Sequence, residues 1–125
     1  MKEEIKTDKA QSAKGLLSQA LISNGFIFTS GFIHVTPDGK LVEGSIEEKF
    51  RQVMTNIEEV LKAANASLND IIKATIYVTD TSILPELNKL YVTYFNEPYP
   101  VREAVCVKEL PLGASIEISV VAVKK

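Results

Sequence analysis

The order of strand-like and helix-like segments constrains the fold of this chain most. Turn signals at Asn24-Gly25 and Pro37-Asp38-Gly39 separate short β-rich runs, which predicts antiparallel hairpins in the first third. The later patterns predict, in order, a helix over 45–64, a strand over 71–79, a helix over about 80–95, and strands over 101–108 and 115–123. Each helix joins two strands over a length suited to a crossover, so some strands should pair in parallel. The simplest architecture is an α+β fold with one mixed β-sheet and two helices packed on one face.

The helix over 45–64 has the clearest signature. Ser45 and Glu48 form an S-x-x-E capping box, and Asn65 suits the left-handed position that follows a helix. The apolar residues that recur at helical spacing are Ile46, Phe50, Val53, Ile57, Val60, Leu61 and Ala64. Two helices of this kind cover only one face of a sheet. We therefore expect another subunit to cover the other face.

Length and composition restrict the class of protein. A chain of 125 residues forms one domain, 1–125, in which the polar residues 1–12 are expected to be loose. The net charge of -2 gives no support to a nucleic-acid or acidic-membrane partner. No apolar run approaches the ~20 residues that span a bilayer. A single cysteine and an acidic start without an apolar core favour a soluble cytoplasmic protein, and a mitochondrial location stays open.

His34 and Cys106 are single residues of their type. Without a second histidine or a nearby cysteine they have no metal-ligand spacing, so no metal site is expected. We interpret His34 as a surface or strand-end residue and Cys106 as a small apolar strand residue.

Arg102 is the residue most suggestive of a binding site. It begins a predicted strand with mostly apolar neighbours, where a guanidinium needs an anion. Its fork suits a carboxylate ligand. A structural salt bridge to Glu103, Glu109 or Glu117 is the alternative, and the pattern alone does not decide between the two.

Two further polar residues interrupt apolar patterns. Glu117 lies between Ile116 and Ile118, where burial would raise its pKa and prepare it for proton transfer; a solvated outer-face residue is the alternative. Asn88 lies in the apolar stripe of the second helix, either at the edge of that stripe or buried and bonded to a strand loop.

Several segments, taken in order, resemble one family. They are Leu41-Val42-Glu43-Gly44, the helix Gln52–Leu61 ending in Ala63-Ala64, Lys73-Ala74-Thr75-Ile76-Tyr77-Val78-Thr79-Asp80, Asn88-Lys89-Leu90-Tyr91 with Tyr94-Phe95, Pro100-Val101-Arg102, and Leu110-Pro111-Leu112-Gly113-Ala114 leading to Ile116-Glu117-Ile118. With these segments the chain resembles the Rid (YjgF) family from about Gly15 to its C-terminus.

The resemblance implies a chorismate-mutase-like fold and a homotrimer with sites at the subunit interfaces. It also implies hydrolysis of 2-imino acids, released by threonine or serine dehydratase, to 2-oxo acids and ammonia, without metal or organic cofactor. The matching positions are Arg102 for the substrate carboxylate and Glu117 for the attacking water. Ser30-Gly31 and Asn88 would shape the site.

The sequence departs from the family pattern at four positions. Leu17 stands where a tyrosine is usual and Phe32 where a polar residue is common, which predicts a more apolar pocket with altered preference or reduced activity. Glu103 replaces a Ser/Thr. Ala104 stands where the family commonly has a cysteine or another residue, and only a backbone N–H would be needed from that position. Cys106 lies two positions farther on and is not the equivalent of that cysteine. A trimer that binds small carboxylates or proteins without turnover is the alternative function.

Overall fold

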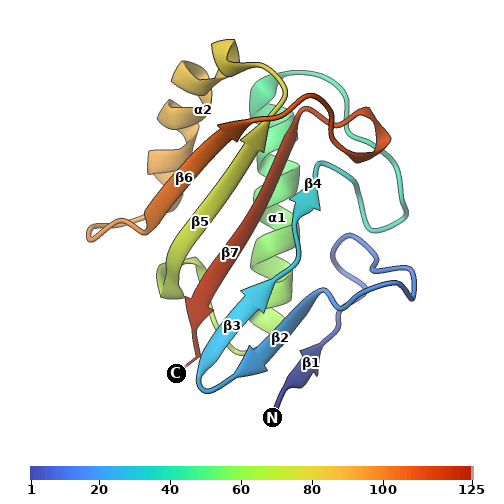
Figure 1. Ribbon diagram of the computed structural model, residues 1–125, viewed down its shortest axis with the longest axis vertical. Helices are drawn as coiled ribbons and strands as arrows, with labels where there is room; N and C mark the ends of the chain where they lie inside the picture. Colours follow the sequence, from blue (N-terminus) through green and yellow to red (C-terminus); the bar gives the residue numbers. More distant parts are fainter. Residues whose placement is uncertain (125) are drawn as a thin grey trace.

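A computed structural model describes residues 1–124, and its strands form one mixed sheet (Figure 1). The strands are β1 (Glu3–Ile5), β2 (Ala20–Ser23), β3 (Phe26–Thr29), β4 (Phe32–Ile33), β5 (Ile71–Val78), β6 (Val101–Cys106) and β7 (Ile116–Val123). Their order is β1-β2-β3-β7-β5-β6, with β4 pairing β7 outside that path. The β5–β6 pair is parallel, as the crossover through the second helix predicts.

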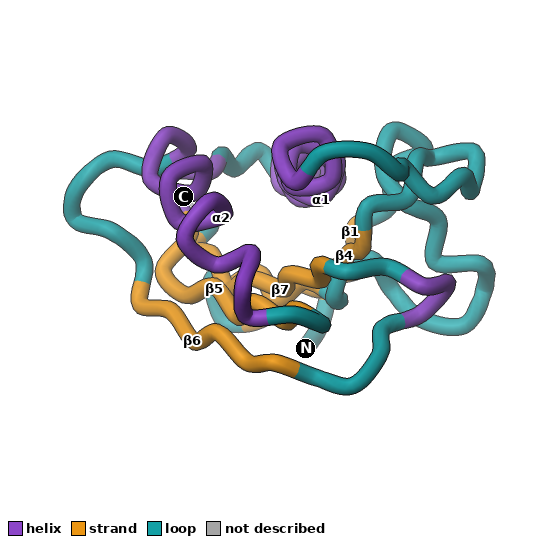
Figure 2. The backbone as a smooth tube through the Cα atoms, turned by 90° about the horizontal axis from the view of Figure 1, so that it is seen from above, coloured by secondary structure: helices purple, strands orange, loops and turns teal. Residues whose placement is uncertain are grey.

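Two α-helices, α1 (Ile46–Ala63) and α2 (Leu84–Tyr91), lie on the same side of the sheet (Figure 2). Short 3₁₀ turns, Thr81–Ile83 and Val92–Tyr94, flank α2 within the range predicted for the second helix. The predicted α+β sheet with two helices on one face is therefore confirmed. None of the helices in residues 1–124 has the length and apolar character needed to cross a membrane.

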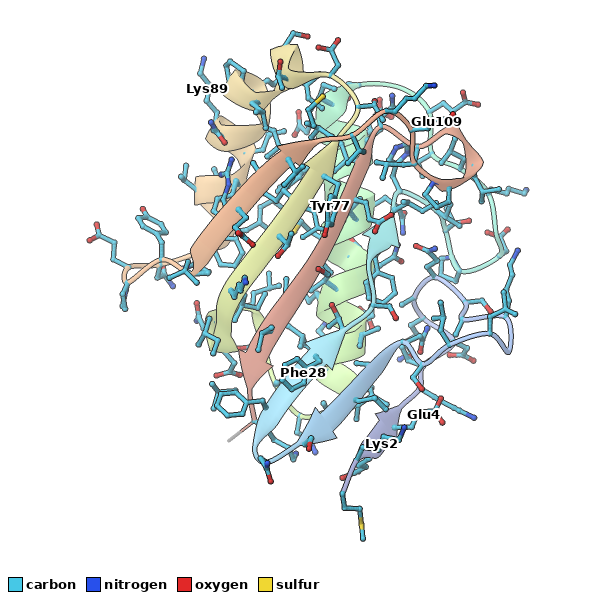
Figure 3. All side chains as sticks on the ribbon, viewed as in Figure 1. Lys2, Glu4, Phe28, Tyr77, Lys89 and Glu109 are labelled. Atoms are coloured by element: carbon cyan, nitrogen blue, oxygen red, sulfur yellow. The ribbon has the colours of Figure 1, made fainter. Side chains whose placement is uncertain are left out.

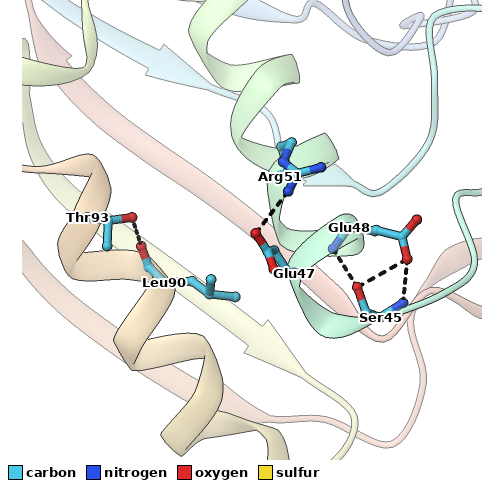
Figure 4. A network of polar contacts seen from close by, with 6 residues as sticks. All are labelled: Ser45, Glu47, Glu48, Arg51, Leu90 and Thr93. Carbon is cyan, nitrogen blue, oxygen red and sulfur yellow. Dashed lines mark hydrogen bonds and ion pairs between the residues drawn. The ribbon is translucent and has the colours of Figure 1, made fainter.

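The N-terminus of α1 carries the predicted capping box (Figure 4). The Glu48 backbone N–H donates to Ser45 Oγ at 3.1 Å, and the Ser45 N–H donates to Glu48 Oε1 at 3.0 Å. Asn65 follows the helix with a φ of 59°, in the left-handed region. Short sequence signals close to Ser45 and Asn65 thus determine where this helix begins and ends.

The main core lies between the helices and the facing side of the sheet. On β7 the side chains alternate, so that Ile116, Ile118, Val120 and Ala122 are all buried in the main core on the side that α1 covers. Their neighbours Glu117 and Ser119 lie on the opposite side, which we call the open face. This alternation follows the sequence pattern of the strand directly.

The open face carries several exposed apolar side chains, and Figure 3 looks onto it with Phe28 and Tyr77 labelled. The exposed apolar side chains of this face are those of Phe26, Phe28, Val101, Val105 and Val123. Phe28 is 49% exposed and Val101 is 66% exposed. Exposed apolar side chains gathered on one face of a protein are a feature of binding interfaces.

The expectation that residues 1–12 are loose is wrong. Glu3–Ile5 form β1 and pair with β2, with Ile5 opposite Ala20. Ile5 and Ala10 are both buried. A three-residue strand with a single buried apolar side chain has too short a period to stand out from a polar sequence.

Candidate functional site

Arg102 lies on β6, where α2 supplies its contacts. Its Nη2 donates to Asn88 Oδ1 at 2.6 Å, and its guanidinium carbon lies 4.8 Å from the centre of the Tyr91 ring. Arg102 pairs with Ala74 on β5, whose side chain is buried beneath the helices. The Arg102 side chain therefore points to the helix side of the sheet. We call Asn88, Tyr91 and Arg102 the arginine cluster.

The guanidinium of Arg102 makes no ion pair within residues 1–124. Glu103 points to the other face, as consecutive strand residues do, and lies 3.5 Å from Lys73. The structural salt bridge to Glu103, Glu109 or Glu117 is thus not formed within this part of the chain. Asn88 is an exposed residue, yet it ties α2 to a strand, so each of its two interpretations is right in part.

Glu117 lies on the open face, opposite Tyr77 on β5 and Ile33 on β4. Its carboxyl group rests against the backbone of Gly31. A Cβ atom at Gly31 would stand 2.2 Å from Glu117 Oε2, so only glycine permits this approach. Burial raises the pKa of Glu117 above its ordinary value. We call Gly31 and Glu117 the glutamate cluster.

A β-bulge between β3 and β4 brings Gly31 to this position. Phe28 pairs with Val121 and Phe32 pairs with Ile118, so the β3–β4 strand advances by one residue more than β7. At the bulge the Val120 N–H donates to Thr29 Oγ1 at 3.0 Å instead of to a backbone carbonyl. The side-chain hydroxyl of Thr29 therefore takes the place of a backbone carbonyl as the acceptor of one hydrogen bond between the strands.

Ser30 turns away from the glutamate carboxyl at this bulge. Its Oγ donates to the Ser18 carbonyl at 2.7 Å, and its N–H donates to the Gln19 carbonyl at 2.9 Å. Ser30 thus fixes the loop that follows Leu17, in addition to supporting the backbone on which Gly31 lies.

The expectation that Phe32 makes the pocket more apolar is wrong. The extra residue of the bulge reverses the alternation, so that Phe32 points into the main core and is 3% exposed. Ile33, not Phe32, shares the open face with Glu117. Leu17 is different: it is 54% exposed and lines an open cavity of about 670 Å³ together with residues of the N-terminal loop.

A buried amide network that the sequence patterns did not indicate holds this loop. Asn56 on α1 is fully buried, and its Nδ2 donates to the carbonyls of Ile33 and Val35 at 3.2 and 2.9 Å. Its Oδ1 accepts the Gln11 N–H at 3.1 Å. Asn56 interrupts the apolar stripe of α1, and that interruption is the one signal that could have revealed it.

His34 follows β4 as a strand-end residue, but the expectation of a surface position is wrong because it is 1% exposed. Its Nδ1 donates to the Val42 carbonyl at 2.7 Å, and its Nε2 accepts the Ser115 N–H at 2.9 Å. Desolvation lowers the pKa of His34, so the neutral ring is favoured. Both nitrogens are occupied, and the ring joins the start of β7 to the loop before α1.

Ala104 and Cys106 are exposed residues of β6. They alternate with residues of the open face, so they share the helix side with Arg102. Cys106 is therefore not the packed apolar residue expected from the sequence. A substrate-binding role for Ala104 stays a prediction.

Arg102 and Glu117 lie on opposite faces of the sheet. Arg102 pairs with Ala74 and Glu117 with Tyr77, and these two partners are three positions apart on β5, an odd offset that places them on opposite faces. β5 also lies between β6 and β7. A single chain therefore does not bring the two charged groups predicted to act together onto one side of the sheet.

Comparisons with known proteins match nearly the full length of the chain, both in sequence and in structure. The family described as "Endoribonuclease L-PSP" matches residues 7–124. A solved yeast structure, YEO7_yeast, superposes with a TM-score of 0.96 at 41% identity, covering 100% of both chains. The structure of E. coli TdcF with bound serine gives a TM-score of 0.91 at 32% identity, covering 98% of this chain and 99% of that one.

Among sequence relatives, a Bos taurus protein named 2-iminobutanoate/2-iminopropanoate deaminase is 38% identical over 121 residues. The match covers 96% of this chain and 88% of the bovine protein. Since the family matches nearly the full length and the fold agrees throughout, the chain belongs to the Endoribonuclease L-PSP family, also known as the Rid (YjgF) family.

Proposed function

We propose that this protein hydrolyses 2-imino acids to 2-oxo acids and ammonia. The observation that carries the proposal is the Arg102 guanidinium, which is held by two uncharged residues and has no carboxylate partner within residues 1–124. A cation held in this way favours a small anionic ligand, and the planar fork suits a carboxylate. Each charge-assisted hydrogen bond would contribute about 1.5–3 kcal/mol.

Glu117 is the group proposed to move protons. Water adds to the imine carbon, the C=N π electrons pass to nitrogen, and the Glu117 carboxylate takes a proton from the water and delivers it to that nitrogen. The Glu117 carboxylate then takes the hydroxyl proton of the resulting carbinolamine and passes it to the amino group. The C=O bond forms as the C–N bond breaks, and ammonia is released. A carboxyl whose pKa is raised by burial is a better base for this step than an ordinary one.

The relatives support the same chemistry. The bovine protein is named for 2-iminobutanoate and 2-iminopropanoate, and TdcF was crystallised with serine, an amino acid that carries the same α-carboxylate. An imine carbon is already electrophilic. Binding the carboxylate and positioning the water can therefore account for much of the rate increase.

We further propose that the working form is a homotrimer with sites between neighbouring copies. Arg102 and Glu117 face opposite sides of one sheet, so a shared site requires two copies. The exposed apolar side chains of the open face, Phe28 and Val101 among them, would be covered in such an assembly. Phe28→Glu should shift the mass measured by light scattering from three chains to one, and an unchanged mass would argue against this interface.

The activity can be tested by adding purified protein to threonine dehydratase and threonine. We expect faster release of 2-oxobutanoate, measured by reduction with lactate dehydrogenase and NADH. Arg102→Ala should lower the added rate by about 100-fold or more, because a bidentate carboxylate contact is lost. The matched control is Arg51→Ala, which removes the chain's only other arginine from a surface pair with Glu47 (Figure 4).

The result also decides between catalysis and binding alone. A non-catalytic carboxylate-binding or protein-binding trimer would gain thermal stability from 2-oxobutanoate but leave the dehydratase product rate unchanged. An Arg102→Ala protein that matches wild type in the coupled assay would contradict the role proposed for Arg102.

A further inference from the structure

The contacts of Arg102 restrain the guanidinium in two different directions. Asn88 and Tyr91 lie three residues apart on α2, so both side chains reach the same strand, β6. Asn88 accepts an N–H from Nη2, and the guanidinium carbon lies over the Tyr91 ring, 4.8 Å from its centre. The hydrogen bond limits sliding within the plane, and the ring limits tilting of the plane.

Tyr91 is a buried residue whose hydroxyl makes no hydrogen bond within residues 1–124. The residue is 5% exposed, and Oη has no hydrogen-bond partner in the described part of the chain. The ring, in contrast, packs against Phe95 with a centroid distance of 4.7 Å and supports the guanidinium on another side. The useful part of Tyr91 is therefore its aromatic face, which attracts a cation.

We propose that Tyr91 is a positioning residue for the carboxylate site: its ring fixes the plane of the Arg102 guanidinium so that the edge not used by Asn88 faces the ligand. The inference rests on the proposed function only for the identity of the ligand. An arginine side chain has many rotamers, and holding it in place before the ligand arrives reduces the entropy lost on binding. The ring does not contact the substrate itself.

Binding of 2-oxobutanoate tests this without any turnover. Its dissociation constant is measured by calorimetry for wild type, Tyr91→Phe and Tyr91→Leu, with the uncharged 2-oxobutanamide as the reference ligand. We expect Tyr91→Leu to weaken binding of the acid by about 3- to 30-fold, the range of a lost cation–π contact, with no change for the amide. Tyr91→Phe should bind as wild type does, because the aromatic face remains.

Tyr94→Leu is the matched control. Tyr94 is a half-buried tyrosine of the adjoining turn that contacts Phe50 edge-on, with 5.4 Å between the ring centroids. It has no hydrogen bond or ring contact with Arg102 within residues 1–124, so its loss should leave acid binding unchanged. Equal weakening by Tyr91→Leu and Tyr94→Leu would show a general packing effect and overturn the inference. So would Tyr91→Phe binding as weakly as Tyr91→Leu, since the hydroxyl would then be the active group.

A second measurement covers the case in which Tyr91→Leu does not fold. In wild type and Tyr91→Phe, the Arg102 Nε–H proton should resonate upfield of its position in the urea-unfolded chain, because Nε is bonded to the guanidinium carbon that lies over the ring of residue 91. An unshifted proton in both proteins would overturn the inference. Wild-type protein that binds the acid no better than the amide would overturn it as well, whatever the imine assay shows, whereas failure of that assay alone would count only against the proposed hydrolysis.

Discussion

The arginine cluster and the glutamate cluster each surround one charged group, and the two groups have different kinds of contacts. Around Arg102 the contacts are an amide and an aromatic ring from one helix, three residues apart in sequence. Around Glu117 the close contact is the backbone of Gly31, brought there by a bulge in a distant strand. The first arrangement offers a hydrogen-bond acceptor and an aromatic ring to the cation. The second desolvates the carboxyl and raises its pKa.

This difference suits two different tasks. A group that binds a carboxylate must stay charged and keep its orientation, whereas a group that moves protons benefits from a pKa closer to neutral. The two clusters also lie on opposite faces of the sheet, so each chain holds two half-sites. In the proposed trimer, the arginine cluster of one copy would meet the glutamate cluster of the next.

Mixing two inactive variants would test this arrangement most severely. Arg102→Ala and Glu117→Ala should each lose about 100-fold or more of the imine hydrolysis. When the two are unfolded together and refolded as mixed trimers, roughly one quarter of the sites would combine an intact arginine from one copy with an intact glutamate from its neighbour. We expect about that fraction of wild-type activity to return in the dehydratase-coupled assay.

Mixing without refolding is the control, since intact trimers of each variant contain no complete site. No recovery after refolding, with mixed trimers demonstrated by mass spectrometry of tagged chains, would contradict a site shared between copies.

Gly31→Ala should have the next largest effect. The added Cβ would overlap Glu117 Oε2, so the carboxyl must move and hydrolysis should fall roughly 10- to 100-fold, equivalent to about 1.4–2.7 kcal/mol. Carboxylate binding at Arg102 should not change. The measurement is kcat/KM beside the dissociation constant for 2-oxobutanoate.

The double variant Gly31→Ala with Glu117→Asp provides the control. The shorter side chain withdraws from the added methyl group, so the two changes together should cost less than the sum of their separate effects. Full additivity would show that the close approach of the carboxyl to the Gly31 backbone has no part in the loss.

Glu117→Gln should have the smallest effect, on the pH dependence of stability. A raised pKa in the folded state means that the folded protein binds more protons than the unfolded chain between the ordinary carboxyl pKa and the raised one. The free energy of unfolding of wild type should therefore fall as pH rises through that window. Glutamine carries no ionisable carboxyl, so Glu117→Gln should be more stable than wild type at pH values above that window. The difference in the free energy of unfolding should be about 1 kcal/mol or less, because the Glu117 carboxyl keeps some contact with solvent.

Urea unfolding at a fixed protein concentration measures this difference, since the stability of an oligomer depends on concentration. Glu86→Gln, on the exposed side of α2, corrects for the loss of a surface carboxylate. A wild-type and Glu117→Gln difference that does not change with pH would contradict desolvation as the cause.

Much of the secondary structure was predictable because its signals are local. The capping box at Ser45 and Glu48 and the Asn24-Gly25 turn each involve residues within a few positions of one another. The strand faces around Glu117 follow from alternation alone. Residues 1–12 escaped prediction because a three-residue strand gains its order from pairing with β2, not from its own pattern.

The site was predictable only in part. The residues Arg102 and Glu117 stand out as charges among apolar neighbours, and the family resemblance indicates their roles. Phe32 was misjudged because a bulge reverses the alternation, and nothing in the local sequence requires an extra residue there. His34 was misjudged because its two partners, Val42 and Ser115, come from separate parts of the chain.

The sequence by itself therefore determined the ends of α1, the hairpin turn, the buried face of β7 and the family, because propensities, caps and alternation act over a few neighbouring residues. Only the tertiary structure decided that Tyr91 supports Arg102, that Gly31 lies against Glu117 and that the two charged groups occupy opposite faces. The physical reason is register: which side chains meet across the sheet depends on how distant segments align, and a shift of one residue reverses every face.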